Sequence, residues 1–128
     1  MAYQNVFKRY ELKFLLTLAQ KEIILGAMRP MMDLDKYGRS TIRNLYFDTD
    51  HYRLIRHSID KPTYKEKLRI RSYESASFDS IVFVELKKKY DHVVYKRRIP
   101  LPEHAAMSWI CGHTPCPTDT VLLTLPFA

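Results

Sequence analysis

Glycine and cysteine are scarce in this chain, and their scarcity excludes several kinds of site. The 128 residues include only three glycines, at positions 26, 38 and 112, which are too dispersed for a glycine-rich phosphate loop. The two cysteines, Cys111 and Cys116, exclude a disulfide scaffold, and their spacing to nearby histidines fits no strong zinc pattern. The signatures of P-loop, dinucleotide-binding, zinc-protease and serine-hydrolase proteins are also missing. Any phosphate bound here must therefore be held by side chains.

Long apolar runs are missing as well. No stretch approaches the ~18 apolar residues of a membrane span, and the N-terminus has no apolar block typical of a signal peptide. We therefore expect a soluble, cytoplasmic protein. Its length suits one domain over residues 1–128 with one hydrophobic core, and we find no internal repeat or second domain.

Positive charge is in excess. The chain has 21 lysines and arginines against 14 aspartates and glutamates, a formal net charge of +7. Such an excess predicts an anionic partner: nucleic acid, a phosphate polymer, a nucleotide or a membrane surface. Nucleic acid is the least favoured, because Glu11, Glu66 and Glu85 lie among the basic residues and no RNA-binding signature is present.

The positive charge alternates with apolar residues in three segments, 63–74, 80–90 and 92–100. Side chains alternate between the two faces of a strand, so each segment predicts one basic and one apolar face. The basic parity holds Lys65, Lys67, Arg69, Arg71, Glu85, Lys87, Lys89, Lys96 and Arg98, and the apolar parity holds Leu68, Ile70, Val82, Val84 and Leu86. Three neighbouring strands of this kind predict a surface for a polyanion, and the arginine fork suits phosphate. A plain solvated face is the alternative, and it is the one we expect for Lys88 and Arg97 on the opposite parity.

The remaining pattern predicts an α+β fold that is mainly antiparallel β-sheet, with one or two packing helices. Thr17 stands three residues before Gln20, a capping-box spacing, and begins a predicted helix at 18–29 whose apolar stripe should pack on the core. The other predicted elements are strands at 6–16 and 41–48, an irregular or short helical connection at 49–60, a tight turn at 90–92 and a helix at 103–111. Pro100 and Pro102 should end the last strand. Tyr46 and Phe47 are expected to pack, and Asp48 to cap a turn or helix.

Five short motifs occur in a fixed order. They are Arg9-x-Glu11-x-Lys13, Leu45-Tyr46-Phe47-Asp48-Thr49, Lys67-Leu68-Arg69-Ile70-Arg71-Ser72-Tyr73, Glu85-Leu86-Lys87 and Tyr95-Lys96-Arg97-Arg98. The set resembles the VTC domain, the polyphosphate polymerase domain of the vacuolar transporter chaperone complex and its bacterial relatives. That domain belongs to the CYTH-like, triphosphate tunnel metalloenzyme group. The resemblance covers residues from about 7 to 99 and leaves the tail, 103–128, unmatched.

The resemblance implies an antiparallel β-barrel whose strands line a tunnel for triphosphate or polyphosphate. It matches the N-terminal half of the family domain, whose second half supplies further tunnel strands and a metal-binding glutamate. We therefore expect a truncated domain, a partial barrel and incomplete catalysis by this chain alone.

The resemblance also implies roles for individual residues. Arg69, Arg71 and Lys87 would be the catalytic phosphate-binding groups. Further substrate contacts would come from Arg9, Lys13, Lys67, Lys96 and Arg98. Glu11, and with it Glu85, would contact a divalent metal, Mn²⁺ or Mg²⁺; alternatively, Glu11 forms only an ion pair with Lys13 or Arg69. The implied reaction transfers the terminal phosphoryl group of ATP to a polyphosphate chain. The alternative is a non-catalytic module that binds polyphosphate or inositol phosphates.

Overall fold

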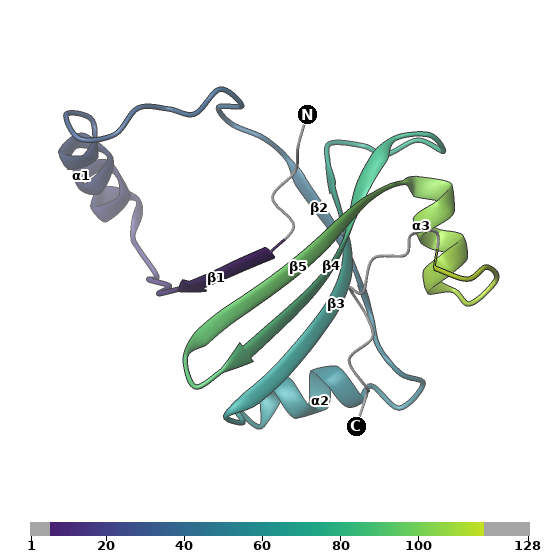
Figure 1. The fold of residues 1–128 in the computed structure, drawn as a ribbon. Coiled ribbons are helices and arrows are strands. Elements are labelled where there is room, and N and C mark those ends of the chain that lie inside the picture. Colours follow the sequence, from purple (N-terminus) through teal and green to yellow (C-terminus); the bar gives the residue numbers. More distant parts are fainter. Residues whose placement is uncertain (1–5, 117–128) are drawn as a thin grey trace.

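The computed structural model describes residues 6–116, and at positions 6, 7 and 9 it describes the backbone alone. The tail predicted to lack a family match therefore lies partly outside the described residues. In chain order the elements are β1 (Val6–Tyr10), α1 (Leu18–Met28), β2 (Ile42–Phe47), α2 (Arg53–Ile59), β3 (Tyr64–Tyr73), β4 (Ile81–Tyr90), β5 (Val93–Pro102) and α3 (Glu103–Ile110) (Figure 1).

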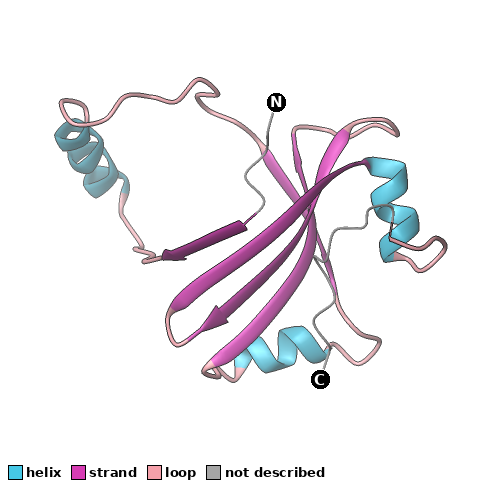
Figure 2. Ribbon diagram, viewed as in Figure 1, coloured by secondary structure: helices cyan, strands magenta, loops and turns pink. Residues whose placement is uncertain are grey.

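The strands form one antiparallel sheet in the order β1-β5-β4-β3-β2 (Figure 2). The three ten-residue strands β3, β4 and β5 lie in its centre, joined by two hairpins. The predicted α+β, mainly antiparallel fold is confirmed. Within the described residues the sheet is open, with β1 and β2 at its two edges, which agrees with a partial barrel.

The core lies on one face of this sheet. Five side chains of the central strands are buried there with Ala106 of α3: Ile70, Val82, Val84, Ile99 and Leu101. Helix α3 packs on β4 and β5, and α2 packs on β3. Since helices cover the apolar face, the basic parity of the same strands is directed to the other face, as the alternation predicted.

The β4–β5 turn sets the register of the two strands. Tyr90 pairs with Val93, and the two residues between them, Asp91 and His92, have φ values of 43° and 66°. Two left-handed residues in a two-residue loop are the geometry of a type I′ turn, whose twist matches that of a hairpin. The predicted tight turn is therefore confirmed.

The ends of two strands differ from the prediction. Strand β1 ends at Tyr10 and does not continue to residue 16. Strand β5 does not stop at its prolines but runs through Pro100 to Pro102. Among residues 6–116 its pairing with β1 reaches only Arg97, so in this part of the chain the missing N–H groups of Pro100 and Pro102 break no ladder hydrogen bond with β1.

Helix α1 confirms one prediction and contradicts another. The capping box is present: the Thr17 hydroxyl accepts from the Gln20 N–H at 3.2 Å, and the Gln20 side-chain oxygen accepts from the Thr17 N–H at 2.9 Å. The expected packing of the apolar stripe is wrong, because no residue of α1 is buried and Leu18 is 82% exposed. The segment 11–41 must lead from β1 at one edge of the sheet to β2 at the other, and α1 lies on the part that arches away from the sheet (Figure 1).

Replacing isoleucine by alanine should affect the free energy of unfolding differently in the core and in the segment 11–41. Ile70→Ala in the core, where the side chain is 6% exposed, should lower the free energy of unfolding by about 2–5 kcal/mol. Ile23→Ala in α1, where the side chain is 72% exposed, should change it by less than about 0.5 kcal/mol. Urea unfolding followed by circular dichroism measures both. Equal losses would contradict this location of the core.

Candidate anion-binding site

The register of the central strands places like charges opposite one another. Lys67 on β3 pairs with Lys87 on β4, and Lys87 pairs with Lys96 on β5. Opposite side chains of an antiparallel pair have Cβ atoms about 5 Å apart, and two charges about 4 Å apart repel by roughly 4 kcal/mol at an effective dielectric of 20. Such a row needs nearby negative charge, from the protein or from a ligand.

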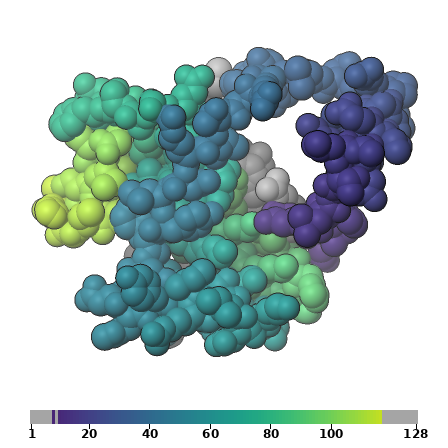
Figure 3. Space-filling model, turned by 180° about the vertical axis from the view of Figure 1, so that it is seen from behind, coloured from purple at the N-terminus to yellow at the C-terminus, as the bar shows by residue number. Residues whose placement is uncertain are grey.

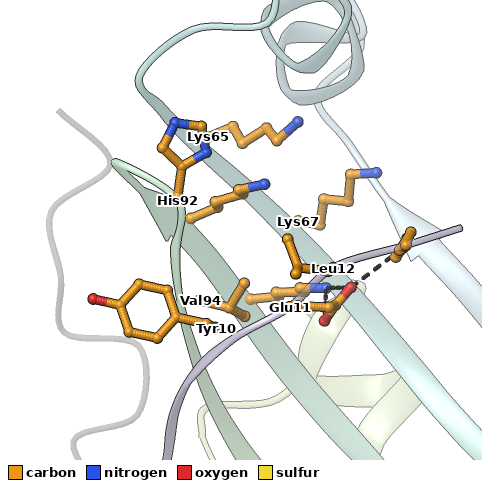
Figure 4. Close-up of a pocket in the computed structure, with 10 residues that line it drawn as sticks. Tyr10, Glu11, Leu12, Lys65, Lys67, His92 and Val94 are labelled. Atoms are coloured by element: carbon orange, nitrogen blue, oxygen red, sulfur yellow. Dashed lines mark hydrogen bonds and ion pairs between the residues drawn. The ribbon is translucent and has the colours of Figure 1, made fainter.

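Two cavities adjoin this row of lysines. The first, of about 290 Å³, is lined by Glu11, Lys13, Arg69, Arg71, Lys87, Val94 and Lys96. The second, of about 440 Å³, is lined by Tyr10, Glu11, Leu12, Lys13, Lys65, Lys67, Lys87, Lys89, His92 and Val94 (Figure 4). Four lining residues are common to both, so the cavities adjoin and form one cationic groove. Figure 3 shows an open space between the arch of residues 11–41 and the rest of the molecule.

The groove brings together most of the predicted substrate contacts. Arg69, Arg71, Lys87, Lys96 and Lys13 line the first cavity, and Lys67 lines the second. Arg98 lies on the same face beside Glu85, with its guanidinium 4.7 Å from the centre of the Phe83 ring. The backbone of Arg9 pairs with Val94, and its side chain lies outside the described atoms. Lys88 and Arg97 line neither cavity.

Glu85 supplies negative charge beneath the arginines. Its side chain is 0% exposed, and its Oε2 accepts from Arg69 Nε at 2.7 Å and lies 2.7 Å from Arg69 Nη2. Arg71 Nε lies 3.8 Å from the same oxygen, and Lys96 Nζ lies 3.6 Å from Oε1. Burial lowers the pKa of the Arg69 guanidinium, but its hydrogen bond to Tyr46 and its contact with Glu85 raise that pKa above the ordinary value. Arg69 is thus held charged.

Strand β2 supplies two contacts that the sequence reasoning missed. The Tyr46 hydroxyl accepts from Arg69 Nη1 at 3.0 Å, and the Asn44 side-chain oxygen accepts from Arg71 Nε at 3.0 Å. The packing predicted for Tyr46 is wrong, since this side chain is 54% exposed, whereas Phe47 does pack against the core. Burial raises the pKa of the Tyr46 phenol, but the hydrogen bond from Arg69 and the nearby positive charges bring that pKa below its ordinary value.

The second cavity contains further groups that were not among the predicted site residues: Lys65, Lys89 and His92. Lys65 and Lys89 are direct cross-strand partners. Burial, followed by the charges of Lys89 and three other lysines, lowers the pKa of the Lys65 ammonium. The sequence did indicate Lys65 and Lys89, because both fall on the basic face of their strands together with Arg69 and Arg71. Nothing in the local sequence marked His92, which reaches the groove because the β4–β5 turn ends there.

Glu11 lies just beyond β1 and contacts two lysines of the groove. Its carboxylate oxygens are 3.3 and 3.4 Å from Lys87 Nζ, and one of them is 3.4 Å from Lys13 Nζ. Burial raises the pKa of the Glu11 carboxyl, but the hydrogen bonds and charges of Lys87 and Lys13 outweigh it and bring that pKa below 4.5. The ion pair with Lys13 that was left open as an alternative is therefore present, with Lys87 as a second partner.

The acidic side chains of the groove fit a divalent metal poorly. Among residues 6–116 no cluster of three or more His, Cys, Asp or Glu side chains could hold one. Glu85 is engaged by Arg69 and surrounded by positive charge, and Glu11 is engaged by two lysines. Mn²⁺ and Mg²⁺ favour several oxygen ligands, which these residues do not offer together. Metal contacts for Glu11 and Glu85 stay a prediction, and we derive no reaction step through a metal.

Asp48 has a structural role at the end of β2. Its Oδ1 accepts from the N–H groups of Thr49 and Leu54, both at 2.8 Å, and its Oδ2 accepts from that of Ile55 at 2.9 Å. These hydrogen bonds satisfy donors in the first turn of α2, which confirms the cap predicted for this residue.

The contact between Glu11 and Lys87 gives a pH-dependent signal. Because its pKa is lowered by folding, Glu11 contributes stability above pH about 4.5, and this contribution is lost as the pH falls through the lowered pKa. Lys87→Gln should raise the Glu11 pKa towards 4.5, whereas Lys88→Gln, on the opposite face, should leave it unchanged. Carbon-detected NMR titration of the Glu11 carboxyl measures this. The same pKa in wild type and Lys87→Gln would show that the contact is not formed.

Comparison with known proteins completes this description. No helix in the described part of the chain is long and apolar enough to cross a membrane. Neither the curated proteins nor the solved structures include a significant match. The family model of the VTC domain, however, matches residues 8–120, which include both cavities and every strand from β2 to β5. The match extends beyond the motifs at about 7–99 and includes residues 103–120, which were predicted to be unmatched. The chain belongs to the VTC domain family.

Proposed function

We propose that the cationic groove binds the triphosphate of ATP and a polyphosphate chain, and that the domain transfers the terminal phosphoryl group of ATP to that chain. One observation carries the proposal. Five cations, from three adjacent strands and the segment after β1, line a single cavity of about 290 Å³. Membership of the VTC family, which is associated with polyphosphate polymerase, supports it.

Phosphoryl transfer asks mainly for positioning and for neutralisation of charge, and less for covalent chemistry by the protein. Arg69 and Arg71 are fixed by neighbours on both sides, so their forks can meet phosphate oxygens without being reordered. Lys87 and Lys96 add charge beside them. In this proposal the lysines of the second cavity neutralise the charge of the more distant phosphates of a linear chain.

VTC domains are generally metal-dependent, and Mn²⁺ or Mg²⁺ is the cofactor we expect. The described residues provide no fitting metal site, so in this proposal their own part is to bind and orient the phosphates.

Binding can be tested without turnover. Isothermal titration calorimetry should detect inorganic tripolyphosphate binding, with an affinity that falls steeply as salt increases. Lys87→Gln should weaken it at least about tenfold, because a charge-assisted hydrogen bond contributes roughly 1.5–3 kcal/mol. Lys88→Gln removes the same charge from the opposite face and should change the affinity less than about twofold. Equal effects of the two variants would show that net charge, and not the groove, governs binding.

Catalysis needs a separate assay. The chain is incubated with ATP, Mn²⁺ and a pyrophosphate primer, and polyphosphate growth is followed on gels together with ADP release. Since we expect catalysis by this chain alone to be incomplete, turnover should be slow, but ADP and longer polyphosphate should form together, and Lys87→Gln should reduce both at least about tenfold. ADP release without chain growth would contradict transfer to polyphosphate.

A second function is favoured by the open sheet. Within the described residues the groove has a sheet on one side only and no metal-binding cluster, which suits a module that binds polyphosphate or inositol phosphates without turnover. This function predicts tripolyphosphate affinity together with no ADP release under the same conditions. Because the two cavities adjoin in series, linear polyphosphate should bind more tightly than inositol hexakisphosphate.

A further inference from the structure

Glu85 is a fully buried carboxylate on the cationic face of the sheet. Burying an ionised carboxylate is costly unless it is paired and hydrogen-bonded. Arg69 meets that need at one oxygen, where Nε and Nη2 both approach Oε2 at 2.7 Å. The pair is therefore more than a surface ion pair: each group compensates the buried charge of the other.

The same carboxylate lies between cations from the two strands that flank β4. Arg69 and Arg71 come from β3, and Lys96 comes from β5, with its Nζ 3.6 Å from Oε1. All three cations line the first cavity, whereas Glu85 lies beneath them and does not line it. Without a shared counter-ion these cations would repel one another and splay apart. Glu85 thus has the position of a residue that assembles the phosphate-binding set.

The Arg69 guanidinium is oriented and still able to bind. Glu85 engages Nε and Nη2, and Tyr46 engages Nη1. A guanidinium carries five N–H groups, so these contacts leave further donors on the two terminal nitrogens for an anion. A metal ion beside Glu85, in contrast, would face the charges of three cations within 4 Å of the carboxylate.

Resting on the proposed function, we infer that Glu85 is a positioning residue that holds Arg69, Arg71 and Lys96 together as one phosphate-binding set, and that it is not a metal ligand. Its charge and its reach should then both matter for phosphate binding when no metal ion is present. A residue that acted only as a metal ligand would matter only when Mn²⁺ is present.

Two variants test the reach and the charge of Glu85, with calorimetric titration of inorganic tripolyphosphate in EDTA as the readout. Glu85→Asp keeps the charge but draws the carboxylate back from Arg69, and it should weaken binding roughly tenfold. Glu85→Gln removes the counter-ion that Arg69, Arg71 and Lys96 share, so the cations should separate and binding should weaken at least about threefold. Unchanged or tighter binding by Glu85→Gln in EDTA would overturn the inference.

The metal is tested directly with the matched change at the other carboxylate. The Mn²⁺ concentration that half-saturates the protein–tripolyphosphate complex, followed by electron paramagnetic resonance, should be the same in wild type and Glu85→Gln. Glu11→Gln is the comparison variant, because it removes the other predicted metal contact by the same chemistry. A several-fold higher requirement for Mn²⁺ in Glu85→Gln would assign Glu85 to the metal and overturn its positioning role.

Wild-type protein provides a test that does not depend on the folding of a variant. If Glu85 assembles the cations, tripolyphosphate binds in EDTA. Binding only in the presence of Mn²⁺ would overturn the inference and leave the proposed function intact. Failure to bind under either condition would overturn both.

Discussion

Repulsion among like charges is the constraint on which the rest of this structure depends. The register of β3, β4 and β5 places Lys67, Lys87 and Lys96 in one row, and a covered apolar face directs them all to the same side. Two carboxylates partly relieve this repulsion. The buried Glu85 lies in the neighbouring row, between Arg69 and Arg98, and the half-buried Glu11 contacts Lys87 from the arch. The groove nevertheless retains an excess of positive charge, which is the electrostatic condition for binding a polyanion.

The two faces of the sheet have different roles, and the alternation of side chains along the central strands produces both. On one face Ile70, Val82, Val84, Ile99 and Leu101 form the core with Ala106 of α3, and on the other face the same strands carry the cations that line the groove. The core thus fixes the positions of the charges, because a strand that slipped by one residue would move its cations into the core. The type I′ turn at Asp91 and His92 stabilises the same register. In this way a stability requirement also sets the geometry of the groove.

Preorganisation distinguishes the arginine end of the groove from its lysine end. Arg69 and Arg71 have hydrogen-bond partners on β2 in addition to their contacts with Glu85, whereas Lys65 and Lys89 face each other across the strands. A fixed guanidinium loses little conformational freedom when it binds phosphate, while a lysine contributes charge on a flexible stem. This difference suits a site in which the arginines hold one phosphate in a defined orientation and the lysines neutralise the charge of the other phosphates.

The sequence by itself determined the order of the strands, the parity of their charges and the capping box of α1, because alternation and capping are local properties of the chain; it did not fix where β1 and β5 end. It also identified the arginines and lysines that meet in the groove and, through ordered motifs, the family. It did not reveal the partners of Arg69 and Arg71 on β2, because Tyr46 and Asn44 become neighbours only through the β2–β3 register. Nor did it reveal that α1 stays exposed, since an apolar stripe shows that a helix can pack but not whether a surface lies within reach. Only the tertiary structure decided that Glu85 is buried among three cations, because the depth of a side chain depends on strands that are distant in the sequence and adjacent in space.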